Sequence, residues 1–136
     1  MIFLDTTVWV GAVDASDRRH LDAKLILEAL IRGDLPLSLT SDYVLNETLT
    51  ILKARRLKPK RVMDVMNRIM LSPKVQVVFV DETIFKESLL FYVKYNDLSF
   101  TDVVSLLIMR KYGVKEIYSH DSDFDKVDWV VRKEKP

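Results

Sequence analysis

The start of the chain decides the fold, because residues 2–5 read Ile2-Phe3-Leu4-Asp5. Three large apolar residues that end at an acid predict a short strand covered on both faces, as in a parallel sheet. Further short extended segments follow at 35–40 (LPLSLT), 75–80 (VQVVFV), 116–119 (EIYS) and 128–132 (DWVVR). The opening stretch is therefore expected to be one strand of a mainly parallel sheet.

Helices are predicted between these strands. A short helix is expected from Thr6 or Thr7, and apolar residues recur at helical spacing over residues 17–32 and 59–71. Further helices are expected over residues 41–54 and 81–95. Residues 99–113 contain the run VVSLLIM, which is apolar almost all round and predicts a buried central helix. Strands that alternate with helices predict a single three-layer α/β domain over residues 1–136.

Composition limits the class of protein. Hydrophobic residues make up 49% of the 136 residues and charged residues 30%, which suits one domain with one core. There is no cysteine, which excludes disulfides and thiolate metal sites. No apolar run could span a bilayer, and the start MIFLD lacks the features of a secretory signal, so we expect a cytoplasmic protein without a membrane partner. The net charge of +1 argues neither for nor against a nucleic-acid substrate.

Two acids follow predicted strands directly. Asp5 ends the first strand and Asp121 follows the strand at 116–119. In open α/β sheets, sites form beyond the carboxyl ends of the strands, so both acids are expected to point into that crevice. Taken singly, each acid also fits a cap or turn residue.

Two further acids lie on predicted helices. Glu47 has mostly apolar neighbours three and four positions away, and an unpaired buried charge is costly, although Glu47 at the edge of the apolar stripe would be solvated. Asp102 ends the string Ser99-Phe100-Thr101-Asp102, which also fits a capping box. Both roles of Asp102 are compatible, because the buried helix behind it would hold the carboxylate rigidly.

A cluster of these four carboxylates would need a cation, because like charges in proximity raise each other's pKa values. Oxygen ligands favour Mg²⁺ or Mn²⁺ over zinc. Such an ion can activate water and stabilise the charge that develops on a phosphate. The acids therefore predict a metal-dependent hydrolytic site.

The chain resembles the PIN-domain family, especially the VapC-like toxin ribonucleases. The opening Ile2-Phe3-Leu4-Asp5-Thr6-Thr7 looks like the family's first strand and first catalytic Asp, and Glu47 matches its mid-chain Glu. The segment Ser99-Phe100-Thr101-Asp102 is similar to its hydroxyl-then-Asp motif. Ser119-His120-Asp121-Ser122-Asp123-Phe124 resembles its T-x-D-x-D-F motif, with Ser119 where Thr is more usual.

The resemblance implies a sheet of about five strands and a divalent-metal site that cleaves RNA. Asp5, Glu47, Asp102 and Asp121 would be catalytic, with Asp5, Asp102 and Asp121 as the metal ligands. Asp123 would be accessory, with Asp125 as an alternative, and Thr7 and Thr101 would orient the acids or a water. Many family members pair with an antitoxin and form homodimers, so both partners are expected.

Several other features have two interpretations. The basic stretch at residues 53–61 could track RNA phosphates or be a solvated connection between helices; its basic residues are Lys53, Arg55, Arg56, Lys58, Lys60 and Arg61. The stripe of Met63, Met66 and Met70 could meet a partner, although core packing is favoured. Trp9 and Trp129 could stack on bases; core packing is favoured for Trp9, and Trp129 stays open.

Two other functions compete with an active ribonuclease. One is a PIN-fold module that binds RNA or protein without catalysis. The other is a phosphohydrolase with an aspartyl nucleophile, which usually needs a second Asp two positions after the first. Thr7 stands there, and no Lys is an obvious candidate for the required cation.

Overall fold

The computed structural model describes all 136 residues and contains one sheet of five parallel strands in the order β3-β2-β1-β4-β5. The strands are β1 (Ile2–Leu4), β2 (Ser38–Ser41), β3 (Val75–Val78), β4 (Glu116–Tyr118) and β5 (Val131–Lys133). The predicted opening strand lies at the centre, paired with β2 on one side and β4 on the other. The expected parallel α/β architecture is confirmed.

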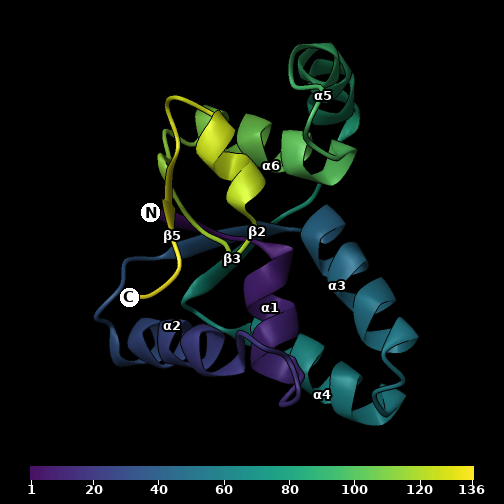
Figure 1. The fold of residues 1–136 in the computed structure, drawn as a ribbon, viewed down its shortest axis with the longest axis vertical. Helices are drawn as coiled ribbons and strands as arrows, with labels where there is room; N and C mark the ends of the chain where they lie inside the picture. Colours follow the sequence, from purple (N-terminus) through teal and green to yellow (C-terminus); the bar gives the residue numbers. More distant parts are fainter.

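Six helices and one 3-10 helix surround the sheet: α1 (Thr6–Val13), α2 (His20–Arg32), α3 (Asp42–Ala54), α4 (Pro59–Leu71), α5 (Glu82–Lys94), α6 (Phe100–Lys111) and η1 (Ser122–Lys126). Figure 1 shows α1, α2 and α4 on one side of the strands and α5 and α6 on the other. Helix α3 contacts both α1 and α6 and so links the two helical layers. These contacts complete the three layers.

The helix ends follow local sequence signals. Ser41 caps α3 by accepting a hydrogen bond from the Val44 N–H at 3.1 Å, and Pro59 opens α4, where its missing N–H is harmless. Gly33, with φ of 86°, ends α2 in the left-handed conformation. Helix α2 begins at His20 rather than near residue 17, because residues 14–19 form a hydrogen-bonded loop.

The last strand was predicted too early. Residues 128–130 form a turn after η1, and β5 pairs with β4 only from Val131 onward. Val130 is apolar because it packs against the core, although it does not pair in the sheet. An apolar residue just before the strand therefore looks like part of it in the sequence.

The core lies between the sheet and the helices. Phe3, Leu4 and Leu106 are fully buried, and residues 102–109 of α6 are all buried, as the apolar pattern predicted. Trp9 is 2% exposed and its indole N–H donates to Thr40 Oγ1 at 3.1 Å, which confirms its core role. None of the helices is long and apolar enough to cross a membrane.

Candidate active site

Asp5 is held at the carboxyl end of β1 by a set of donors. It is 3% exposed, and its Oδ2 accepts hydrogen bonds from Ser119 Oγ at 2.7 Å, Thr7 Oγ1 at 3.0 Å and Thr7 N at 3.4 Å. Burial raises the pKa of Asp5 above its ordinary value, while the hydrogen bonds from Ser119, Thr6 and Thr7 lower it in part. The site therefore fixes the orientation of this carboxylate but leaves it in a poorly solvated place.

Thr7 and Ser119 join the two strand ends that carry Asp5 and Asp121. Thr7 Oγ1 accepts from the backbone N–H of His120 at 2.9 Å, and Ser119 Oγ accepts from the backbone N–H of Asp121 at 3.0 Å. Because β1 and β4 are neighbours in the sheet, residues 5–7 meet residues 119–121 at the same edge. Thr7 is thus placed to orient Asp5, and Ser119, which was singled out from the sequence only as part of the motif around Asp121, adds a second anchor.

Asp102 lies in the first turn of α6 and is 8% exposed. Its backbone N–H donates to Ser99 Oγ at 3.2 Å, so Ser99 caps the helix as the capping-box pattern suggested. Burial and then the charge of Asp5 raise the pKa of Asp102 to about 7, with further contributions from the charges of Asp121 and Glu47. Asp102 therefore occupies a capping position and also faces the other acids.

Glu47 reaches the same cluster from α3. Burial raises the pKa of Glu47, followed by the charge of Asp5, and the charge of Asp121 adds to the effect. The Thr101 side chain partly offsets this rise, so the predicted accessory threonine lies near Glu47. The charges of Asp5 and Asp121 thus act on both Glu47 and Asp102, so the four predicted acids gather in one region of the molecule.

No protein cation neutralises these four carboxylates. The ion pairs of the chain involve other acids, among them Asp123 with Lys126 at 3.2 Å and Asp125 with Arg132 at 2.8 Å. Neither Asp123 nor Asp125 is among the charges that act on Asp102 or Glu47. Buried carboxylates that repel each other and lack a counter-charge are suited to a divalent cation.

The arrangement of the acids is open. Nowhere does the structure bring three His, Asp or Glu side chains into a geometry that could hold a metal ion as it stands. Mg²⁺ usually keeps several waters and takes only one or two carboxylates together with substrate phosphates, so a complete protein cage is not needed. The donor set therefore fits a hard cation in chemistry, and the ligands would be completed by water and substrate.

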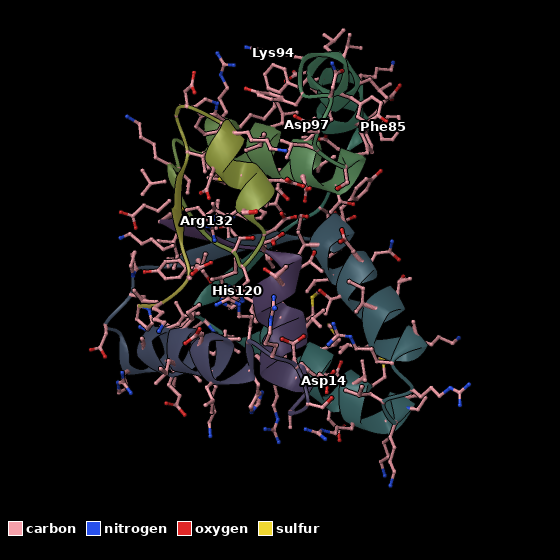
Figure 2. All side chains as sticks on the ribbon, in the orientation of Figure 1. Asp14, Phe85, Lys94, Asp97, His120 and Arg132 are labelled. Atoms are coloured by element: carbon pink, nitrogen blue, oxygen red, sulfur yellow. The ribbon has the colours of Figure 1, made fainter.

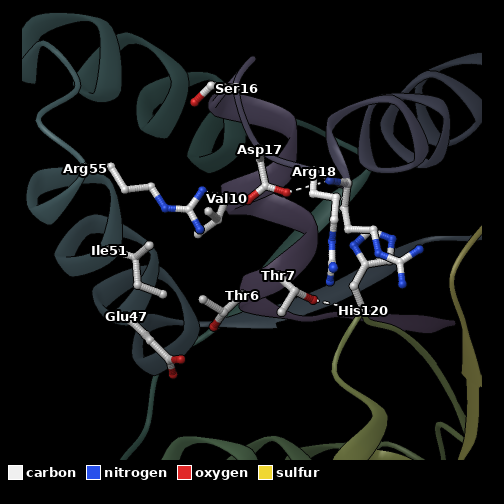
Figure 3. Close-up of a pocket in the computed structure, with 11 residues that line it drawn as sticks. Thr6, Thr7, Val10, Ser16, Asp17, Arg18, Glu47, Ile51, Arg55 and His120 are labelled. Carbon is white, nitrogen blue, oxygen red and sulfur yellow. Dashed lines mark hydrogen bonds and ion pairs between the residues drawn. The ribbon is translucent and has the colours of Figure 1, made fainter.

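A cleft of about 450 Å³ opens beside the acids (Figure 3). Its acid-side wall is formed by Glu47, Thr6 and Thr7, and its far wall by the loop that carries Asp17, Arg18 and Arg19. The Thr6 hydroxyl is buried there without a hydrogen-bond partner. Arg18 and Arg19 were not singled out from the sequence, because a pair of arginines in a loop carries no motif.

The predicted basic stretch is divided by the fold. Arg55 alone of its six basic residues lines the cleft, and its Nη1 lies 2.8 Å from Asp14 Oδ2 and 2.6 Å from Asp17 Oδ2. Arg61 Nη2 donates to the Val13 carbonyl at 3.2 Å, so it also supports the end of α1. The other four basic residues are exposed and form no ion pairs: Lys53, Arg56, Lys58 and Lys60.

Three comparisons place this chain among known proteins. The family profile described as PIN domain matches residues 2–130. The 23S rRNA-specific endonuclease VapC20 of Mycobacterium tuberculosis is 34% identical over 137 residues, which cover 98% of this chain and 100% of that protein.

Solved structures agree with this result. The crystal structure of Mycobacterium tuberculosis VapC20, described as a sarcin-ricin loop cleaving toxin, matches with a TM-score of 0.81 and 32% identity, over 96% of this chain and 97% of that one. A toxin-antitoxin complex from Klebsiella pneumoniae shares the fold, with a TM-score of 0.65 and 18% identity over 96% of each chain. The family profile, the full-length sequence relative and the shared fold agree, and the chain therefore belongs to the PIN-domain family, in its VapC-like branch.

Proposed function

We propose that this protein is a divalent-metal-dependent endoribonuclease and the toxin of a toxin-antitoxin pair. The observation that carries the proposal is the set of four acids, Asp5, Glu47, Asp102 and Asp121, which act on one another electrostatically and have no protein cation. Mg²⁺ or Mn²⁺ would supply the missing charge.

Each residue has a role that follows from its position. Asp5, Asp102 and Asp121 would hold the ion, whose chemistry when bound is to activate water and to stabilise charge on a phosphate. Thr7 and Ser119 keep Asp5 oriented through their hydrogen bonds of 3.0 and 2.7 Å. Glu47, whose pKa is raised, is suited to accept the proton of an attacking water, and Thr101 orients it.

The substrate is proposed to be 23S ribosomal RNA. The relative that matches this chain from end to end at 34% identity is named a 23S rRNA-specific endonuclease. A structured RNA loop is therefore the first substrate to test, before unstructured single strands.

The test compares Asp5→Asn and Asp102→Asn with wild type in cleavage of purified ribosomes and of a sarcin–ricin hairpin, with Mg²⁺ and with chelator. Cleavage by wild type should need the metal. The cleavage rate of each variant should fall by about 100-fold or more, because each lacks a carboxylate that stabilises the transition state. Asp64→Asn, an exposed acid on α4, is the matched control and should cleave like wild type. Cleavage by both active-site variants at the wild-type rate would show that the site is wrongly assigned.

A binding module without catalysis is the second candidate, and the observation that favours it is the open arrangement of the acids. It predicts RNA binding in chelator with no gain on adding Mg²⁺ and no cleavage. Calorimetric titration with Mg²⁺ distinguishes the two, because only the enzyme needs the ion.

Two protein partners complete the proposal. The Klebsiella pneumoniae structure that shares this fold is a toxin-antitoxin complex, which supports an antitoxin partner for this chain. A largely apolar groove between α3 and α4 could seat an antitoxin segment; it is lined by Leu49, Lys53, Leu57, Pro59, Val62 and Met63. Of the methionine stripe, Met66 is core at 6% exposed, Met63 is 52% exposed and lines this groove, and Met70 is 47% exposed but lies outside it.

A second copy of the chain is proposed to cover the outer face of α5. This helix lies at one end of the molecule, and its exposed apolar residues include Leu90 at 74% and Val93 at 76% (Figure 2 labels Phe85 on the same helix). Apolar side chains this exposed on one helix are typical of an interaction face.

A further inference from the structure

We propose that Arg18 binds a phosphate of the RNA substrate next to the phosphate that is cleaved. Arg55 would be a positioning residue, because it holds the loop that carries Arg18. This inference rests on the proposed ribonuclease function and gives the cleft beside the acids a role in binding the substrate. The substrate group it predicts there is a non-scissile backbone phosphate.

The first observation is the distribution of charge along the cleft. One wall carries Glu47 and the opposite wall carries Arg18 and Arg19, so the cavity of about 450 Å³ runs from the acidic cluster to a basic loop. A strand that has its scissile phosphate at the acids and runs along this cleft would place a neighbouring phosphate inside it. Figure 3 shows the Arg18 side chain extending from the loop in the direction of Thr7 and His120.

The second observation is that Arg18 is free. Arg55 is held by Asp14 and Asp17, and Arg19 lies 3.7 Å from Asp22 and 3.5 Å from Glu134, whereas Arg18 forms no ion pair or hydrogen bond. A guanidinium without a protein partner retains its full capacity for bidentate bonding to a phosphate. Of the three arginines of the cleft, Arg18 is therefore the one available to an anion.

The third observation is that the loop is rigidly built around this free side chain. Asp14 Oδ1 accepts from Ser16 N at 3.0 Å and from Ser16 Oγ at 2.7 Å, and Asp17 Oδ1 accepts from Arg19 N at 2.8 Å. Arg55 joins both acids to the end of α3 at 2.8 and 2.6 Å. The backbone on each side of Arg18 is thus fixed, while its side chain remains unpaired.

The fourth observation lies inside the cleft. Thr6 is 3% exposed and lines the cavity, yet its Oγ1 has no hydrogen-bond partner. A buried hydroxyl without a partner costs about 1–3 kcal/mol, so it is seldom left that way unless a water or ligand completes it. Because the oxygen has almost no exposed surface, a ligand or water in the cleft would complete it only after a small movement of the Thr6 side chain.

The test measures RNA binding without cleavage. A fluorescent sarcin–ricin hairpin is titrated with wild type, Arg18→Ala and Arg18→Lys in chelator, over salt concentrations from roughly 50 to 200 mM, the range in which phosphate contacts change affinity strongly. Arg68→Ala, an exposed arginine on α4 that forms no ion pair, is the matched control. Loss of one phosphate contact should weaken binding about tenfold at low salt and reduce the slope of log Kd against log salt by about 1, with Lys intermediate.

Kinetics give an independent readout. In Mg²⁺, Arg18→Ala should raise KM by a similar factor and leave kcat nearly unchanged, because the contact is made equally before and during the reaction. Wild-type affinity and salt slope in Arg18→Ala, with normal cleavage by wild type, would overturn this inference and leave the proposed function intact. If wild type neither binds nor cleaves RNA, both proposals are overturned. If it binds RNA without cleaving it, only the catalytic part is overturned.

Discussion

Ser119 Oγ donates a hydrogen bond of 2.7 Å to Asp5 Oδ2 and so ties together two residues that are 114 positions apart in the chain. The contact exists because β1 and β4 are parallel neighbours, which brings the residues after Leu4 and Tyr118 to one edge of the sheet. The same hydroxyl accepts from the Asp121 N–H at 3.0 Å. One small side chain therefore fixes the relative position of two acids of the site.

Ser119→Ala tests this anchor. Removing the hydroxyl leaves Asp5 with only its Thr6 and Thr7 donors, so we expect cleavage to fall about 10-fold to 100-fold, as for other residues that orient metal ligands. Ser119→Thr keeps the hydroxyl and should retain most of the activity. Cleavage rates and Mg²⁺ affinity measure the effect, and equal Mg²⁺ affinity in Ser119→Ala and wild type would show that the anchor does not matter.

The parts of the site that the sequence predicted are those fixed by local pattern. Asp5 and Asp121 follow apolar strands, and parallel pairing alone brings such positions together. Asp102 carries a capping motif at the start of an apolar helix, and the structure keeps both features. For these residues, strand ends and helix ends give both the place and the direction of the side chain.

The residues that the sequence did not predict depend on contacts between distant segments. Arg55 belongs to a basic stretch that suggested RNA binding, yet it binds Asp14 and Asp17, which lie 41 and 38 positions away. In our proposal, Arg18 can bind RNA because no acid of the chain forms an ion pair with it. Whether a given arginine is paired or free is decided by tertiary packing, which spacing along the chain does not reveal.

The pKa of Asp102 makes the stability of the metal-free protein depend on pH. The folded-state pKa of about 7 lies above the ordinary value of 3.8, so between these values the unfolded chain loses its proton first. The contribution of Asp102 to stability is therefore full below pH 4 and is lost as pH rises to about 7, by up to about 4 kcal/mol. Mg²⁺ should remove most of this loss, because the ion favours the charged form.

Thermal unfolding as a function of pH, with Mg²⁺ and with chelator, measures this effect. Asp102→Asn should flatten the chelator curve between pH 4 and 7 relative to wild type and should abolish most of the gain from Mg²⁺. Asp64→Asn, which changes an exposed acid, is the control and should follow wild type. Superimposable curves for wild type and Asp102→Asn would contradict the electrostatic coupling.

Arg55→Ala should loosen the loop that carries Arg18. Asp14, which is 6% exposed, loses its cation, and because Arg55 is itself 41% exposed the loss of stability should be modest, about 1 kcal/mol. RNA affinity should nevertheless fall, since Arg55 no longer holds the backbone on each side of Arg18 in place. Arg55→Lys should restore part of the affinity.

Limited proteolysis and the salt slope distinguish this positioning role from direct phosphate contact. Arg55→Ala should be cleaved faster within residues 14–19 than wild type, and its salt slope should stay closer to wild type than that of Arg18→Ala. A slope reduced by about 1 together with unchanged proteolysis would mean that Arg55 itself contacts a phosphate.

The exposed face of α5 should control self-association. Leu90 and Val93 are 74% and 76% exposed and are three positions apart on α5, so they form a short apolar strip on one face of this helix. Helix α5 lies at one end of the molecule (Figure 1). Leu90→Lys combined with Val93→Lys should convert a dimer to a monomer without a loss of thermal stability in the monomer, because neither side chain is buried within the chain. Leu71→Lys changes a residue that is 83% exposed on α4 and should leave the dimer intact, since it lies outside the strip. Sedimentation velocity over a range of protein concentrations reports the outcome, and a wild-type protein that stays monomeric throughout would rule out a second copy as the partner of this face.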